Sequence, residues 1–504
     1  MNFLADQHVL VLGLGASGLA LARWCIRLGA RVTVADTRAV PPQLDALHSQ
    51  LPTAAFLCSS MDAALLATSP FDMVLKSPGL SPATVAGVVE AARTRGLAIG
   101  NELSLFAHAL ADLKADGGYA PQVIGITGTN GKTTVTTLTG LLVQRAGKSV
   151  AVAGNIGPTL LDTLTQQLDA EALGAALPEV WVLELSSFQL DGVSNFEPTV
   201  ATVLNITQDH LDWHGTLAAY GAAKANVYGH LGVMLLNRDD RLVMQAAPAL
   251  VKGKPVRPYI TFGTSEPKRP GDYGIETANG MAWLARAAEA DETIKRRKYE
   301  DAVVYVQRLM PVDALRIRGR HNASNALAAL ALAAAAGCGI GPMLHGLRDY
   351  RGEPHRVESV AVLDDVEYFD DSKGTNVGAT AAALSGLGVD RKLVVILGGE
   401  GKGQDFSPLA EPVMRYARAV ILIGRDAALI RAALTGAGLP LLDASSMDHA
   451  VELAARQAQT GDAVLMSPAC ASFDMFRDYG HRAEVFCESV RQLAERSTHS
   501  QGTV

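Results

Sequence analysis

The chain has 504 residues, of which 48% are hydrophobic and 19% charged, and its formal net charge is −7. This length exceeds what one hydrophobic core supports, so we expect two to four domains of α/β protein, with three fitting best. The charge balance provides no overall basic field, which argues against nucleic acid as a partner.

Residues 8–36 read as a strand, a glycine turn, a helix and a second strand. Gly13, Gly15 and Gly18 form G-x-G-x-x-G, and Asp36 closes the second strand, where a ribose-binding carboxylate often stands. The pattern predicts a Rossmann-like domain over residues 1–118. Alone it supports dinucleotide binding only weakly, so an NAD-dependent dehydrogenase remains one alternative.

From Gln122 onward, short β-rich runs alternate with helical stretches, which predicts a second parallel sheet in a P-loop ATPase-like central domain, 119–350. Residues 265–315 lose this alternation, so we expect irregular strands and an insertion there. A helix follows, with Asn322 or Asn325 as its N-cap and Gly337 at its end.

The longest apolar run, around 326–340, is mostly alanine, and it predicts a buried helix rather than a membrane span. From residue 351 a third set of strands begins, each ending in glycine or small polar residues, which predicts a C-terminal Rossmann-like domain over 351–504.

The five cysteines fit neither a disulfide framework nor a zinc site. We expect a cytoplasmic monomer.

The segment G-I-T-G-T-N-G-K-T-T, residues 125–134, departs from the standard phosphate-loop spacing, which requires glycine where Ile126 stands. Its glycines are expected to turn backbone N–H groups toward phosphate oxygens, Lys132 to bridge the β- and γ-phosphates, and Thr133 to bind magnesium. A nucleotide switch or motor protein is a second alternative. The candidate ATP-binding residues are Gly125, Thr127, Gly128, Thr129, Asn130, Gly131, Lys132, Thr133 and Thr134.

Glu184, His210 and Lys224 are interpreted here from residue type and position alone. Glu184 ends the buried strand V-W-V-L-E, and a carboxylate there suits a hard cation such as Mg²⁺. His210 in Q-D-H-L-D is either a metal ligand or a hydrogen-bonded structural histidine. Composition alone makes Lys224 a solvated lysine on a helix.

The motif T-G-T-N-G-K-T-T resembles the ATP-binding signature of the Mur ligases, cell-wall enzymes that add amino acids to UDP-N-acetylmuramic acid. G-N-I-G (154–157), E-L-S-S-F-Q-L (184–190) and N-I-T-Q-D-H-L-D (205–212) follow in the family's order, and the resemblance covers nearly the whole chain. It is strongest to the members that add D-glutamate. Ligases for L-alanine, diaminopimelate or folylpolyglutamate share the ATP core, but the chain has no D-N-P-R acceptor signature, which counts against the diaminopimelate type.

The resemblance implies two magnesium ions, with His210 as a ligand and Lys224 carbamylated by CO₂ so that it can hold the second ion. The catalytic residues would be Lys132, Glu184, His210 and Lys224, and the metal ligands Thr133, Glu184, His210 and carbamylated Lys224. The remaining ATP contacts implied are Asn322, Asn325, Arg356 and Asp371, with His355 beside Arg356 in the linker to the third domain.

The resemblance also assigns the other substrates. The UDP-substrate candidates are Gly15, Ala16, Ser17, Asp36, Thr37, Arg38, Ser77, Pro78, Gly79 and Asn155. The D-glutamate candidates are Lys373, Thr375, Lys402, Ser472 and Tyr479; at the last position the family more commonly has Phe. Lysine and hydroxyl donors are suitable chemistry for carboxylates.

The reaction implied joins D-glutamate to UDP-N-acetylmuramoyl-L-alanine at the expense of ATP. The L-alanine carboxylate attacks the γ-phosphate to give an acyl phosphate and ADP, and the D-glutamate amine then displaces phosphate. The sequence assigns no group to take the proton from that amine.

Overall fold

The structure is a computed structural model that describes residues 3–251, 254–289 and 304–501. The chain divides into two compact units. The first contains the chain up to Phe262, apart from Thr207–Asp209, together with Ala328–Met343. The second contains Thr207–Asp209, Gly263–Leu327 and the chain from Leu344 onward.

The first sheet is a five-stranded parallel sheet in the order β3-β2-β1-β4-β5. Its strands are β1 (His8–Leu12), β2 (Arg31–Asp36), β3 (Ala55–Cys58), β4 (Met73–Lys76) and β5 (Ala98–Gly100). Its helices are α1 (Ala16–Arg27), α2 (Leu44–Gln50), η1 (Ala63–Ala67), α3 (Pro82–Thr94) and α4 (Glu102–Gly117). Every residue of β1 is buried, as expected for a central strand covered on both faces. The order reverses between β1 and β4, which is where open α/β sheets bind ligands.

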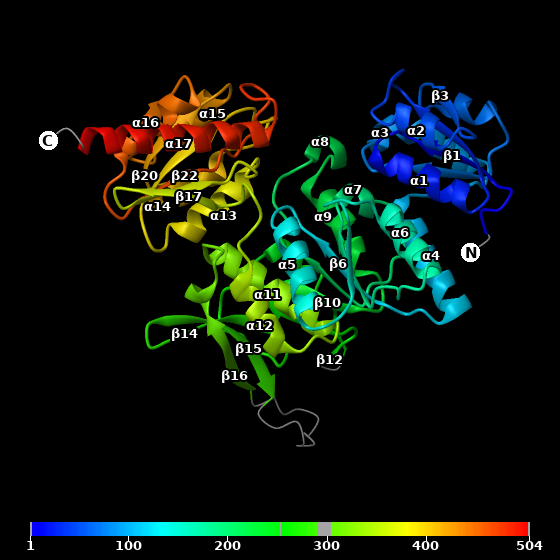
Figure 1. Cartoon of the computed structure of the whole chain (residues 1–504), viewed down its shortest axis with the longest axis horizontal. Coiled ribbons are helices and arrows are strands. Elements are labelled where there is room, and N and C mark those ends of the chain that lie inside the picture. The colour runs from blue at the N-terminus through cyan, green and yellow to red at the C-terminus, as the bar shows by residue number, and fades with distance from the viewer. Residues whose placement is uncertain (1–2, 252–253, 290–303, 502–504) are drawn as a thin grey trace. The chain divides into compact units, whose positions relative to one another are not determined.

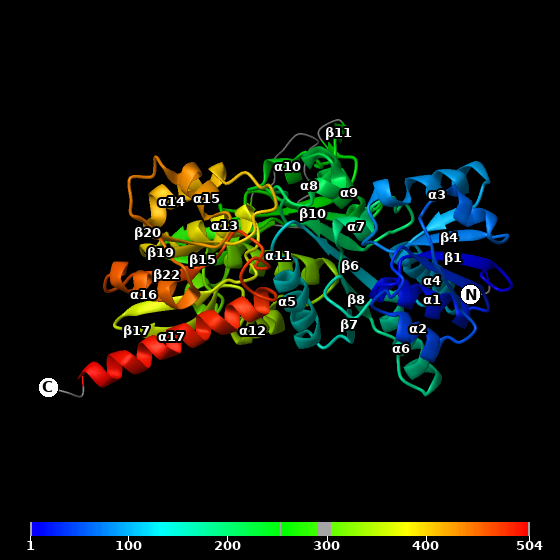
Figure 2. The ribbon, with the colours of Figure 1, turned by 90° about the horizontal axis from the view of Figure 1, so that it is seen from above.

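The second sheet has six parallel strands in the order β13-β10-β9-β6-β8-β7. Its strands are β6 (Gln122–Thr127), β7 (Val150–Gly154), β8 (Val180–Glu184), β9 (Val200–Val203), β10 (Val233–Asn237) and β13 (Tyr259–Phe262), with β11 (Leu250–Val251) and β12 (Lys254–Pro255) as a separate pair. Its helices are α5 (Lys132–Arg145), α6 (Leu160–Ala172), α7 (Ser187–Leu190), α8 (Leu211–His214), α9 (Leu217–Ala225), η2 (Asn226–Tyr228) and α10 (Arg241–Met244). Helix α5 lies alongside β6 and β8 (Figure 2).

The segment expected to hold irregular strands and an insertion forms a three-stranded antiparallel sheet. Its strands are β14 (Tyr273–Ala278), β15 (Met281–Glu289) and β16 (Val304–Pro311), followed by η3 (Val312–Ala314). The pairing shifts register between Leu284 and Ala285, which is the irregular element of this otherwise ordinary sheet. Residues 290–303 of the expected insertion lie outside the described residues.

The predicted alanine-rich helix is α11 (Arg320–Ala335), and α12 (Ile340–Asp349) follows it. The predicted N-cap is wrong, because the helix begins at Arg320, upstream of both asparagines. Asn322 Nδ2 instead donates to the carbonyl oxygen of Arg318 at 2.8 Å, and Asn325 Nδ2 donates to Asn322 Oδ1 at 3.1 Å. Their side chains therefore tie the first helical turns to the preceding loop.

The third large sheet has the order β17-β18-β22-β19-β20-β21, parallel except for the β17–β18 hairpin. Its strands are β17 (Glu358–Leu363), β18 (Val366–Asp370), β19 (Leu393–Gly398), β20 (Ala417–Ile423), β21 (Leu441–Asp443) and β22 (Ala463–Met466). Its helices are α13 (Val377–Leu387), η4 (Ser407–Leu409), α14 (Ala410–Tyr416), α15 (Ala427–Leu434), α16 (Met447–Gln457) and α17 (Tyr479–Gln501). Helices α16 and α17 pack against each other (Figure 1).

The three sheets confirm the predicted α/β class with three domains, whereas the boundaries at residues 118 and 350 stay predictions. Among the described residues, no helix combines the length and apolarity needed to cross a membrane.

Candidate active site

Gly13 and Gly18, in the turn after β1, are each required to be glycine for a different structural reason. Gly13 has a φ of +85°, and a Cβ built on Gly18 would lie 2.0 Å from the Gly13 carbonyl oxygen. Only glycine allows the helix to begin so close to the strand. Helix α1 starts at Ala16, so its N-terminal amides, including that of Ser17, open at the end of β1.

Asp36 holds this turn in place. Its buried carboxylate accepts a hydrogen bond from the Leu14 amide at 2.8 Å and two from the Arg38 guanidinium at 2.8 and 2.9 Å. The hydrogen bonds from Arg38, with that from Leu14, lower the pKa of Asp36 to about 2 against the cost of burial. Asp36 is therefore a charged anchor for the turn, and the adjacent Thr37 and Arg38 are exposed.

The segment Ser77-Pro78-Gly79 directly follows β4, the strand that pairs with β1. Ser77 is buried and its amide donates to the Leu12 carbonyl at 2.9 Å, so this turn stands beside the glycine turn. The predicted UDP-substrate residues of the first sheet thus gather at its carboxyl edge. Asn155, the predicted contact from the second sheet, is exposed and donates to Glu184 Oε1 at 2.7 Å.

The phosphate loop connects β6 to α5, as predicted, and Asn205 fixes its shape. The Asn205 carbonyl accepts from the Thr129 amide at 3.0 Å, and Asn205 Oδ1 accepts from the Asn130 amide at 2.8 Å. Asn205 Nδ2 donates back to the Asn130 carbonyl at 3.0 Å. Gly131, with a φ of +82°, then turns the chain into the helix.

Gly125 does not belong to this loop, contrary to the expectation from its position in the motif. It lies within β6, paired with Leu183 on one side and Ala201 on the other. A Cβ at this position would come within 3.0 Å of Val227 and 3.2 Å of Phe196. Packing of the Val227 and Phe196 side chains against β6 therefore explains why residue 125 is a glycine.

Lys132 and Lys224 meet at one carbonyl group. Lys132 Nζ donates to the carbonyl oxygens of Gly128 and Thr129 at 2.9 and 2.8 Å. Lys224 Nζ donates to the same Gly128 oxygen at 2.9 Å and lies 4.5 Å from the centre of the Tyr220 ring. Lys224 is only 1% exposed, so the expectation of a solvated lysine from composition alone is wrong. Because a buried lysine amine is costly unless it has a role, Lys224 is a candidate for a chemical function in the site.

Glu184 ends β8 beside Ile126 of β6, and it is buried. Asn155 bonds one carboxylate oxygen, whereas Oε2 has no hydrogen-bond partner among the described residues. A buried carboxylate oxygen without a donor fits a hard cation, which would replace the missing hydrogen bond. Glu184 therefore suits the magnesium site predicted for it.

His210 precedes the short helix α8, has a φ of +53° and is exposed. Its ring centre lies 4.7 Å from that of Phe188 and 6.3 Å from that of Tyr220. The Tyr220 hydroxyl donates to Thr129 Oγ1 at 3.2 Å, and Lys224 lies over the same tyrosine. Tyr220 thus connects His210 and Lys224 to the phosphate loop.

In the second unit, the predicted D-glutamate residues follow three adjacent strands of the C-terminal sheet, β18, β22 and β19. These residues are Lys373 and Thr375 after β18, Lys402 after β19, and Ser472 and Tyr479 after β22. Lys373 Nζ lies 3.6 Å from the centre of the Tyr479 ring. Because these strands are parallel, their carboxyl ends share one edge, so the segments that carry these residues all leave the sheet at that edge.

Asp371 also follows β18. It is buried, accepts a hydrogen bond from the Ser467 hydroxyl at 2.6 Å, and faces the charge of Arg356. Burial raises its pKa to about 7, although the hydrogen bond from Ser467 opposes the shift. A carboxyl group with such a pKa is a candidate for a functional role.

Comparison with known families identifies this arrangement. The chain matches the MurD-like N-terminal domain of Mur ligases over residues 7–100, the Mur ligase middle domain over 126–333, and the glutamate ligase domain over 355–470. The chain belongs to the Mur ligase family.

Two relatives of this Mur ligase carry the name UDP-N-acetylmuramoylalanine–D-glutamate ligase. The protein from Albidiferax ferrireducens is 66% identical over 498 residues, and the alignment covers 98% of each chain. The protein from Burkholderia thailandensis is 57% identical over 497 residues, covering 96% of this chain and 97% of its own. Because one family covers all three sheets, the dehydrogenase and motor-protein alternatives lose their support.

Solved structures show the same fold at low identity. The MurF ligase of Thermotoga maritima in complex with ADP aligns with a TM-score of 0.55 and 15% identity, over 98% of this chain and 96% of its own. A MurF from Acinetobacter baumannii aligns with a TM-score of 0.53 and 16% identity, over 96% of this chain and 92% of its own. Membership of the Mur ligases implies ATP and Mg²⁺ for this chain.

Asn205, Tyr220 and Asp370 were not predicted as site residues from the sequence. Asn205 lies 75 residues from the loop that it fixes, and Asp370 contacts a residue 15 positions away, so spacing gave no signal. Tyr220 carried a weak signal, because it lies four residues before Lys224 on a predicted helix and therefore on the same face.

Proposed function

We propose that this Mur ligase adds D-glutamate to UDP-N-acetylmuramoyl-L-alanine and that the reaction is driven by cleavage of ATP to ADP and phosphate. The observation that carries the proposal is the 66% identity, over 98% of both chains, to a relative named for this reaction. The site residues support it, since the chain has a glycine-rich loop before α5 and, after the strands of the C-terminal sheet, lysine and hydroxyl side chains that suit carboxylates.

In the first half-reaction, Lys132 and the amides of the loop and the α5 N-terminus bind the triphosphate. These donors stabilise the charge that develops as the L-alanine carboxylate attacks the γ-phosphate. Lys132 now bonds two loop carbonyls, so its ammonium group must turn from them to the nucleotide. The UDP part of the substrate would lie at the α1 N-terminus, against Ser17 and the Ser77 turn.

Thr133, Glu184, His210 and Lys224 would hold two magnesium ions, which when bound supply charge neutralisation at the transferring phosphoryl group. The orphaned Glu184 Oε2 fits this role. Lys224 fits it after carbamylation by CO₂, since the product is an anionic oxygen ligand. Two ammonium groups at the single Gly128 oxygen repel each other, and a carbamate removes one of these charges.

In the second half-reaction, Lys373, Thr375, Lys402, Ser472 and Tyr479 would position D-glutamate by its carboxylates. Its amine attacks the acyl carbon, and the tetrahedral species expels phosphate to leave the amide. Asn322, Asn325, Arg356 and Asp371 would contribute to the ATP site.

The test supplies ATP, Mg²⁺ and UDP-N-acetylmuramoyl-L-alanine with each of a panel of amino acids. We expect phosphate release coupled to a product heavier by one glutamyl residue with D-glutamate, and none with L-alanine or diaminopimelate. Incorporation of another amino acid would contradict the proposed specificity. ¹⁸O from the L-alanine carboxylate should appear in the released phosphate.

A further inference from the structure

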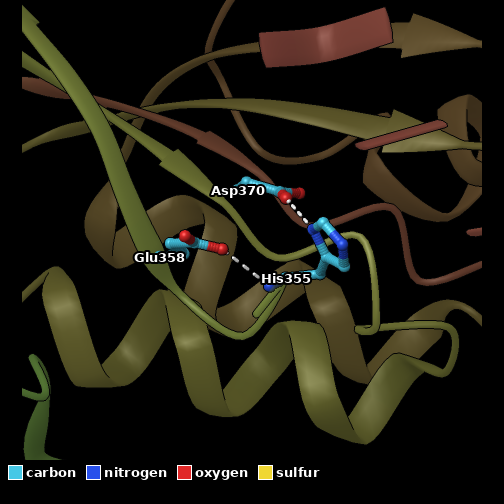
Figure 3. Close-up of side chains that lie close together, drawn as sticks. All are labelled: His355, Glu358 and Asp370. Carbon is cyan, nitrogen blue, oxygen red and sulfur yellow. Dashed lines mark hydrogen bonds and ion pairs between the residues drawn. The ribbon is translucent and has the colours of Figure 1, made fainter. Parts of the chain in front are cut away.

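His355, Glu358 and Asp370 form a compact cluster in the C-terminal domain (Figure 3). His355 precedes β17, and Glu358 and Asp370 pair across the β17–β18 hairpin. His355 Nδ1 lies 2.7 Å from Asp370 Oδ2, and Glu358 accepts a hydrogen bond from the His355 backbone amide at 2.9 Å. An imidazole and a carboxylate are thus held as a pair.

Asp370 is buried, and hydrogen bonds hold its carboxylate in place. It is 0% exposed, and its other oxygen accepts a hydrogen bond from the Ser372 amide at 2.9 Å. A buried carboxylate on Nδ1 keeps the proton on that nitrogen, which leaves the lone pair of the imidazole on Nε2. His355 is 30% exposed, so the pair has one buried and one accessible end.

The backbone around His355 is strained. His355 has a φ of +63° and Val357 a φ of +51°, which is a costly conformation for a β-branched residue. Hydrogen bonds to the segment after β18 hold the turn: the Lys373 amide donates to the His355 carbonyl at 3.1 Å, and the Val357 amide donates to Asp371 Oδ1 at 3.3 Å. Strain maintained by its surroundings in this way is typical of functional sites.

The pair stands next to the proposed carboxylate anchors. The ring centre of His355 lies 6.2 Å from that of Tyr479, over which Lys373 Nζ lies at 3.6 Å. In an α-amino acid the amine and a carboxylate share one carbon atom. A group that takes a proton from the amine must therefore lie close to the side chains that bind that carboxylate.

We propose that His355, oriented by Asp370, is the base that accepts a proton from the ammonium group of D-glutamate. This inference rests on the proposed function. At neutral pH the free amino acid carries –NH₃⁺, which has no lone pair for attack. His355 Nε2 takes one proton, and the amine nitrogen forms its bond to the acyl carbon. The tetrahedral species breaks the C–O bond to phosphate, which leaves with that electron pair, and the amide nitrogen gives its surplus proton to the departing phosphate.

Several charged or titratable groups face the pair from the surrounding elements. They are Glu358 on β17, Asp370 on β18, Arg356, Asp371 and Lys373 in the adjoining loops, and Tyr479, Arg482 and Cys487 on α17. Asp370 is the carboxylate that touches the imidazole ring. It is a positioning residue in this proposal, because it acts through His355.

The test compares D-glutamate with hydroxylamine as the nucleophile. Hydroxylamine is already unprotonated at neutral pH, so it captures the acyl phosphate as a hydroxamate without a base. In His355→Asn we expect kcat with D-glutamate to fall by about 10²- to 10⁴-fold with a small change in KM. Hydroxamate formation should stay near the wild-type rate, which also shows that the variant is folded. Exposed His345→Asn is the matched control and should behave as wild type.

The pH profile provides a second readout. As pH rises, more D-glutamate is present as the free amine, so the deficit of His355→Asn should shrink. Asp370→Asn should lower kcat with D-glutamate and spare hydroxamate formation in the same way. If either variant lost the same fraction of its rate with D-glutamate and with hydroxylamine, or lost no rate with either nucleophile, the assignment of His355 as the base would be overturned. Stoichiometric Zn²⁺ binding that disappears in His355→Asn would overturn it in favour of a metal site. If the wild type forms hydroxamate but no product with D-glutamate, the proposed specificity for D-glutamate fails, and the assignment of His355 fails with it. If the wild type forms neither product, the proposed activation of the L-alanine carboxylate by ATP fails.

Discussion

Lys132 and Lys224 donate to the same carbonyl oxygen, that of Gly128, each at 2.9 Å. One lysine begins the helix after the phosphate loop, and the other comes from α9, about ninety residues later in the chain. The Gly128 carbonyl therefore joins the two cationic side chains that the family resemblance selects.

Replacing Lys132 should remove charge stabilisation from the transferring phosphoryl group. For Lys132→Ala we expect the ligation rate to fall by at least about 10²- to 10³-fold, the range for loss of one preorganised donor. The initial rate of phosphate release measures this, with exposed Lys114→Ala as control. An unchanged rate would show that the loop does not hold the triphosphate.

Lys224→Ala should abolish most activity, because the variant has no amine for CO₂ to modify. Short carboxylic acids such as formate should restore part of it by occupying the space of the carbamate. Independently of activity, ¹³C-bicarbonate should give a carbamate NMR signal in the wild type that the variant lacks. If Lys224→Ala turned over at the wild-type rate, or if active wild-type enzyme gave no carbamate signal, carbamylation of Lys224 would be contradicted.

Asp371→Asn should stabilise the fold while it damages the reaction. The pKa of Asp371 is about 7 in the folded chain against an ordinary value of 3.8, so above pH 4 the unfolded state ionises more readily and this carboxyl lowers stability. The variant should therefore unfold at a higher temperature, by roughly a few degrees at pH 8 and less at pH 5. Calorimetry without ligands measures the difference. If the increase in unfolding temperature did not become larger as the pH rises from 5 to 8, the raised pKa of Asp371 would be contradicted.

Asp36→Asn should loosen the glycine turn. Loss of charge-assisted hydrogen bonds from Leu14 and Arg38 should lower the free energy of unfolding by about 1–3 kcal/mol and raise KM for the UDP substrate. The pKa of Asp36 is lowered, to about 2, so its contribution is present above about pH 4 and is lost as the pH falls toward 2. Exposed Asp45→Asn is the control, and identical urea unfolding of both variants would count against the anchor.

Local patterns predicted the strands of the three large sheets well, whereas the ligands at their carboxyl ends stay predictions. β6, the phosphate loop and α5 follow from an apolar run, glycines and a helix-forming stretch, which are features of neighbouring residues. The start of α11 was wrong by a few residues, because a loop carbonyl rather than a cap partners Asn322. The burial of Lys224 and the pairing of His355 with Asp370 depend on which strands lie side by side, and residue spacing does not encode this.

The three hydrogen bonds between Asn205 and the segment Thr129–Asn130 have a further consequence. They hold the loop backbone in its conformation before a nucleotide binds, so an arriving nucleotide meets a preformed cradle and little binding energy is spent on ordering that backbone. Mutations at the end of β9 should then weaken nucleotide affinity without touching the nucleotide.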